Sequence, residues 1–275
     1  MAFATELDEL ANAFGGSPIA EHDAAEPRYP MALVIDVSGS TAAVGADGIS
    51  DIDKINQAVA SIYQALRQPP AGDPLEMTNH QVDLCIIAYS SEPSVILPWT
   101  AAPDLPAIAP LLSPQGGTAT GKALLATLDV CLARMSRYKK DGLPKCGQPN
   151  IFHLTDGGAN DVAIGTAQWH QIESRMKILA PKAQDRKGLL YHFVSPSGYL
   201  GSSGGSDAQG RPMSGADLLG QWFGTDSVIP LAQGTAGFQR MAELVVKTIT
   251  AVSRQAADNR EIMTMLKVQG IAHAA

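Results

Sequence analysis

The sequence predicts an α/β fold: a doubly wound, mainly parallel sheet flanked by helices, with one antiparallel edge strand. Short apolar runs alternate with segments of helical spacing from residue 31 onward. The runs are continuously apolar, which is typical of strands buried on both faces. Only a few residues separate the strand-like segments 82–90 and 94–99. So short a connection predicts a hairpin, which places one antiparallel strand at the sheet edge.

The elements follow in a regular order along the chain. The apolar run 31–36 is the first strand. Segment 50–68 has apolar residues at helical spacing, begins with the N-cap candidates Ser50 and Asp51, and is stopped by two prolines. A short helical turn broken by prolines is expected at 103–112. The remaining elements are expected at 120–138 (helix), 150–157 (strand), 164–180 (helix), 188–195 (strand) and 238–255 (helix).

Composition divides the chain into an acidic extension (1–29), one domain (30–254) and a C-terminal tail (255–275). The extension contains a short amphipathic helix at 7–14, which we expect to pack on the domain; alternatively, its acids reach a metal site in the same or a neighbouring molecule. Residues 195–210 are rich in Gly and Ser and predict a flexible loop that borders the site.

Charge and cysteine content limit the function classes. The chain has 275 residues, a net charge of −7 and a pI near 5.3, which argues against non-specific binding to nucleic acid or anionic membrane. Its three cysteines form no CxxC motif, and Cys85 and Cys131 lie in apolar segments as small core residues. With an acidic start that lacks the pattern of a signal peptide and no apolar run near 18 residues, a cytoplasmic protein is expected.

Three distant segments place hydroxyls and carboxylates where predicted strands or loops end. Asp36, Ser38 and Ser40 form a D-x-S-x-S pattern, Thr118 lies in "QGGTATG", and Asp156 lies in "LTDGG". In a parallel sheet, ligands bind outside the carboxyl ends of the strands where strand order reverses. Hard oxygen ligands of this kind suit Mg²⁺, and five of them leave a position open to an oxygen from outside.

These three motifs, in this order, resemble the metal-ion-dependent adhesion site of the von Willebrand factor A domain, a Rossmann-like fold. The resemblance covers about residues 30–254 and is nearest to intracellular bacterial TerY-like proteins. It implies that Ser38, Ser40 and Thr118 supply hydroxyl oxygens, while Asp36 and Asp156 bind Mg²⁺ (alternatively Mn²⁺ or Ca²⁺) directly or through water. It further implies a non-enzymatic adaptor whose protein partner completes the coordination with a Glu or Asp, in a tellurium-resistance, stress or phage-defence type of system.

Other functions remain open at this point. Gly116 to Lys122 approaches the phosphate loop G-x-x-x-x-G-K-[ST], but Ala123 replaces the hydroxyl residue. The same metal would also serve a phosphoester hydrolase, although aspartyl phosphate chemistry at Asp36 normally uses D-x-D. A third alternative is a regulatory subunit of an ATPase or a kinase–phosphatase complex. His153 and His192 lie in apolar strands, where we expect them to be neighbouring core histidines satisfied by hydrogen bonds; alternatively, they form a functional pair.

Overall fold

The structure is a computed structural model that describes residues 26–143, 146–155, 159, 161–181, 190–194, 207, 209–211, 213–223 and 227–253. Within these residues, six strands form one sheet in the order β3-β2-β1-β4-β5-β6. The strands are β1 (Tyr29–Asp36), β2 (Val82–Tyr89), β3 (Pro93–Ala101), β4 (Asn150–Thr155), β5 (Leu190–Val194) and β6 (Val228–Pro230).

Strand pairing confirms the predicted fold class. β1 pairs in parallel with both β2 and β4, and β4, β5 and β6 continue the parallel pairing. β3 pairs antiparallel with β2 and is the antiparallel edge strand. The chain passes from β1 to β2 on one side, and from β3 through α3 (Thr120–Lys140) to β4 on the other. Strand order therefore reverses between β1 and β4, where such sheets bind ligands.

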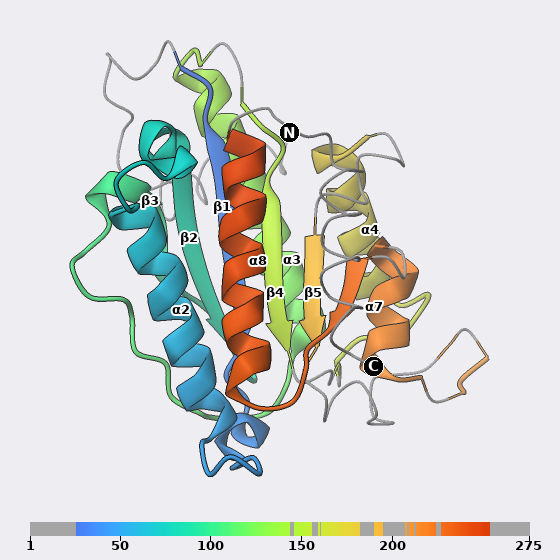
Figure 1. Cartoon of the computed structure of the whole chain (residues 1–275). Coiled ribbons are helices and arrows are strands. Elements are labelled where there is room, and N and C mark those ends of the chain that lie inside the picture. Colours follow the sequence, from blue (N-terminus) through green and yellow to red (C-terminus); the bar gives the residue numbers. More distant parts are fainter. Residues whose placement is uncertain are drawn as a thin grey trace.

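Helices cover both faces of the sheet (Figure 1). Besides α3, they are α2 (Asp51–Arg67), α4 (Ala167–Leu179), α7 (Gly215–Phe223) and α8 (Thr235–Ser253). Short 3₁₀ turns are η2 (Gly39–Ala42), η3 (Pro74–Met77), η4 (Asn79–Gln81) and η5 (Ala102–Asp104). One hydrophobic core joins α2 and α8 to the sheet, and the other joins α3, α4 and α7 to it. None of the described helices is long and apolar enough to cross a membrane.

Side-chain caps fix where helices begin. Ser50 Oγ accepts from the N–H of Asp53 at 3.3 Å, which confirms the predicted cap of α2. The Asp161 carboxylate accepts from the N–H groups of Gly121 (2.8 Å) and Lys122 (2.9 Å) in the first turn of α3. Asp161 thus satisfies two amides that have no partner within the helix.

The structure differs from the sequence-based expectation in several segments. The helical turn expected at 103–112 was too long, because only Ala102–Asp104 is a 3₁₀ turn. The chain beyond it is held instead by two hydrogen bonds between the Asn56 side chain and the backbone of Leu112 (3.0 and 2.9 Å). β6 and α7 were not predicted. Residues 1–25 of the extension, all of the 255–275 tail and most of 195–210 lie outside the described residues.

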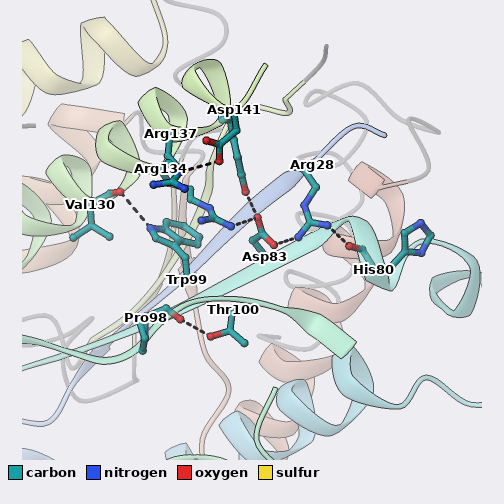
Figure 2. Close-up of polar contacts among 11 residues, drawn as sticks. Arg28, His80, Asp83, Pro98, Trp99, Thr100, Val130, Arg134, Arg137 and Asp141 are labelled. Carbon is teal, nitrogen blue, oxygen red and sulfur yellow. Dashed lines mark hydrogen bonds and ion pairs between the residues drawn. The ribbon is translucent and has the colours of Figure 1, made fainter. Parts of the chain in front are cut away.

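A buried ionic cluster lies at the amino-terminal end of β2 (Figure 2). Asp83 is fully buried and accepts from Arg28, from Arg134 Nη2 at 2.7 Å and from the Tyr138 hydroxyl. Burial alone would raise the pKa of Asp83, but Arg134 and Arg28, aided by hydrogen bonds from Arg28 and Tyr138, outweigh it and lower the pKa below its usual range. The two guanidinium groups therefore keep this carboxylate charged inside the protein.

Candidate metal centre

The D-x-S-x-S motif forms a tight polar turn at the end of β1. Asp36 is the last residue of the strand and is 1% exposed. Its Oδ1 accepts from the backbone N–H of Ser38 at 2.8 Å, and Thr41 Oγ1 donates to the Ser38 carbonyl at 2.8 Å. Ser38 Oγ and Ser40 Oγ lie 2.9 Å apart, with Ser38 buried and Ser40 exposed. The motif thus presents a carboxylate and two adjacent hydroxyls at the strand end.

The loop that carries Thr118 is bonded to this turn through the backbone. Gly39 N–H donates to the Gly116 carbonyl at 3.1 Å, and Gln115 N–H donates to the Val37 carbonyl at 2.7 Å. Thr118 follows two residues later and is half-buried. Two segments about 80 residues apart in the sequence therefore lie side by side at the carboxyl end of the sheet.

Gly116 has a conformation and surroundings that favour glycine. Its φ is +63°, in the left-handed region that other residues rarely adopt. A Cβ atom at this position would lie 2.8 Å from Ser91 Oγ and 3.0 Å from Ser90 Oγ. Ser90 and Ser91 also hold the loop, because the Ser90 carbonyl accepts from Ala119 N–H (2.7 Å) and Ser91 Oγ accepts from Gly117 N–H (3.0 Å).

The end of β4 meets the end of β1 at Asp36. Thr155, the last residue of β4, donates from Oγ1 to Asp36 Oδ2 at 3.2 Å. Asp156 follows Thr155 in the chain and lies outside the described residues. The structure therefore brings together Asp36, Ser38 and Ser40, places the Thr118 loop beside them, and ends β4 at the same point.

A buried hydrogen-bond network lies behind Asp36. The Tyr89 hydroxyl is 3.4 Å from Asp36 Oδ2, 3.4 Å from Thr120 Oγ1 and 2.7 Å from His153 Nε2. His153 is fully buried, and burial lowers its pKa to about 3, so the ring is neutral at pH 7. A neutral ring that donates from Nε2 to Tyr89 leaves the tyrosine proton directed at Asp36.

Sequence reasoning missed Tyr89, Thr120 and Thr155 as parts of the site. A signal existed, because Tyr89 and Thr155 end strands on either side of β1, next to the strand that ends at Asp36. The prediction that His153 is a core histidine with a hydrogen-bond partner is confirmed. Its expected neighbour His192 pairs with it in the β4–β5 register.

The arrangement of oxygens fits a small hard cation. Two ligands in adjacent positions of an octahedral Mg²⁺ site, each at about 2.1 Å from the ion, are separated by about 3.0 Å. The hydroxyl oxygens of Ser38 and Ser40 are hydrogen-bonded to each other at 2.9 Å, a separation close to this spacing. The described part of the chain contains no group of three or more His, Cys, Asp or Glu side chains placed to hold a metal ion.

The phosphate-loop alternative finds no support at the start of α3. A phosphate at a helix N-terminus binds to the amide groups of the first turn. Here the amides of Gly121 and Lys122 already donate to the carboxylate of Asp161. Lys122 Nζ forms an ion pair with Glu92 at the surface.

Comparison with known proteins finds a matching family model and solved structures with a similar fold. Residues 31–159 match the family model described as the von Willebrand factor type A domain. The pilus adhesin SpaC from Lactobacillus rhamnosus GG is similar in structure (TM-score 0.53, 13% identity), with 82% of this chain and 30% of that chain covered. The PilB minor pilin from Streptococcus sanguinis (TM-score 0.46, 13% identity, 88% and 65% covered) and BatB from Bacteroides thetaiotaomicron (0.44, 16%, 81% and 98%) are also similar. No curated protein sequence matches the chain.

Proposed function

We propose that this chain is a metal-dependent adaptor that binds a protein partner, because residues 31–159 match the model of the von Willebrand factor type A domain. The observation that carries the proposal is the 2.9 Å pair of serine hydroxyls beside the buried Asp36 carboxylate. Ser38, Ser40 and Thr118 would hold Mg²⁺ with Asp36 and Asp156. When bound, the ion supplies a positive centre that a Glu or Asp of the partner binds.

The residues of the chain have separate tasks in this proposal. Ser40 is exposed and presents its hydroxyl to solvent. Ser38 is held in the turn by the hydrogen bond that its backbone N–H donates to the Asp36 carboxylate. Thr155 and Tyr89 orient the Asp36 carboxylate by donating hydrogen bonds to its Oδ2 atom. An ion held by these residues would leave one position open, and there it would supply a positive charge for the acidic side chain of the partner.

The protein acts, in this proposal, in the cytoplasm and without catalysing a reaction. The proposal extends to a role like that of the TerY-like proteins, in a tellurium-resistance, stress or phage-defence type of system. It rests on the motif resemblance and on the acidic, cysteine-poor composition. Genes next to the one that encodes this chain would test the assignment, because an adaptor of such a system is expected beside its partners.

Calorimetric titration with Mg²⁺ and with Mn²⁺ tests the site. We expect Ser40→Ala to weaken metal binding about tenfold, equal to about 1.4 kcal/mol, because it removes one exposed ligand without disturbing the core. Ser61→Ala is the matched control, since Ser61 is an exposed serine on α2 away from the site. Equal metal affinity of wild type and Ser40→Ala would refute the role of this hydroxyl.

Pull-down from cell extract tests the adaptor role. A partner should be captured in Mg²⁺, lost in EDTA, and lost with Ser40→Ala while the Ser61→Ala protein retains it. Replacing one Glu or Asp of that partner by Gln or Asn should weaken the complex roughly 100- to 1,000-fold, because one charge of a close pair then lacks its counterpart, at a cost of about 3 to 5 kcal/mol. Metal-dependent hydrolysis of a generic phosphoester would instead favour the enzyme alternative.

A further inference from the structure

A groove runs along the outer surface between α2 and α8. It has a volume of about 800 Å³, and its lining residues include Ala65, Pro74, Ala242, Val246, Thr250 and Ala251. Alanines along facing helices allow another backbone to approach closely, since interaxial distance depends on the side chains at the contact. The small side chains that line the groove therefore leave room for the backbone of an additional helix.

The groove opens at the point where the described chain leaves α8. Pro74 also lines an adjoining hollow of about 430 Å³, together with Met77, which is 80% exposed, and Ser253. Ser253 is the last described residue of α8, and its Oγ is 2.8 Å from Thr78 Oγ1. The chain that follows Ser253 therefore starts at the end of the groove.

We propose that the C-terminal segment, residues 254–275, folds back along α8 and places an amphipathic helix over residues 259–268 in this groove. Ile262, Met265 and Leu266 have the i, i+3, i+4 spacing of one helix face. A helix of ten residues is about 15 Å long, and the part of α8 that lines the groove, Gln239 to Ala251, is about 18 Å long. The five residues 254–258 suffice for the turn of a helical hairpin.

Charge favours this segment over residues 1–25, which precede Glu26; Glu26 contacts His80 and Ser253 contacts Thr78, at the same end of the domain. Asp73 and Glu243 line the groove with Lys247, so acidic groups are in excess there. Residues 254–275 contain three basic and two acidic side chains, whereas residues 1–25 contain five acidic side chains and neither Lys nor Arg. The acidic segment would be repelled where the C-terminal segment is attracted.

Thiol labelling of the full chain tests the proposal. Ala65→Cys places a thiol in the groove, and Ala60→Cys places one on the exposed surface of α2 outside it. Both are made with Cys146→Ser, because the other native thiols, Cys85 and Cys131, are fully buried. We expect the thiol at position 65 to react at least tenfold faster when Leu266→Asp is added, while the rate at position 60 stays unchanged.

The alternatives give different results. A labelling rate at position 65 that Leu266→Asp leaves unchanged overturns the proposal. So does acceleration by Leu10→Asp alone, which would assign the groove to the N-terminal segment, or protection that increases with protein concentration, which would assign it to a second copy. Circular dichroism checks that Leu266→Asp leaves the domain folded. Its Mg²⁺ affinity should equal that of wild type, so failure here is distinct from failure of the metal site.

Discussion

Replacing Asp83 by Asn tests whether the buried ionic cluster stabilises the fold. The variant leaves the guanidinium groups of Arg28 and Arg134 buried, with side chains 4% and 2% exposed, and without the carboxylate that both contact. Breaking a buried pair in this way costs about 3 to 5 kcal/mol. For a domain of this size, the melting temperature should fall by about 6 to 20 °C.

Asp141→Asn is the matched control for Asp83→Asn. Asp141 pairs with Arg137 at 2.8 Å four residues apart on the surface of the same region (Figure 2). These side chains are 24% and 30% exposed, so solvent screens the pair and its loss costs only about 0.3 to 0.5 kcal/mol. Urea unfolding followed by circular dichroism measures both. A loss of less than about 1 kcal/mol for Asp83→Asn would refute the inference that the two arginines depend on this carboxylate.

The pH dependence of the same variant provides a second measurement. The pKa of Asp83 is lower in the folded than in the unfolded protein, so as pH falls the unfolded chain takes up the proton first. The stabilisation from the Asp83 carboxylate is therefore complete above the pKa of Asp83 in the unfolded chain, which is about 4. It is lost as pH falls through the lower pKa that Asp83 has in the folded protein. The difference between wild type and Asp83→Asn should stay constant from pH 7 to 5 and narrow below pH 4.

Three further predictions concern the candidate site. Tyr89→Phe should lower the free energy of unfolding by about 1 to 3 kcal/mol, because it removes the 2.7 Å hydrogen bond to buried His153. It should also weaken Mg²⁺ binding in calorimetry, because Asp36 loses a hydrogen-bond donor. If both quantities stay unchanged, the hydrogen-bond network does not support the site. Burial lowers the pKa of His153 to about 3 in the folded protein, whereas its pKa in the unfolded chain is about 6.5, so between these values only the unfolded chain gains the proton. Between pH 6.5 and 5, the free energy of unfolding measured in urea should therefore fall by about 2 kcal/mol more for wild type than for His153→Gln. Equal pH dependence of the two proteins would contradict a buried, neutral His153. Gly116→Ala should weaken Mg²⁺ binding and lower the free energy of unfolding more than Gly142→Ala does. Both glycines have positive φ, but of the two only Gly116 has atoms of Ser90 and Ser91 where a Cβ would lie. Equal effects of the two substitutions would show that contact with these serines is not the cause.

The sequence predicted the strands and helices that have clear apolar patterns. The runs that became β1, β2 and β4 were recognised because each is buried on both faces and reads as continuously apolar. β1 begins at Tyr29, two residues before the expected start, and includes Pro30, a residue that normally argues against a strand. β6 has only three residues, too few for a periodic pattern.

The candidate site was predicted only in part, for a physical reason. Asp36, Ser38 and Ser40 are close in sequence, so their shared turn could be inferred from one motif. Tyr89 and Thr155 reach Asp36 from neighbouring strands, and that contact depends on strand order and register. Asp83 was missed for a related reason, because its two arginines come from distant parts of the chain.

The position of Glu26 determines how the protein can be attached to a surface. Glu26 contacts His80 (2.5 Å) and Gln81 (2.8 Å) beside the first residue of β2, at the amino-terminal end of the parallel strands. Asp36 ends β1 at their carboxyl-terminal end. The eight residues of β1 separate these two ends by about 26 Å. A sensor surface or bead coupled ahead of Glu26 would hold the molecule with its serine hydroxyls facing the solution. Immobilisation from this side should therefore preserve binding in surface-based kinetics, and coupling through the 43–50 loop beside the D-x-S-x-S turn should block it.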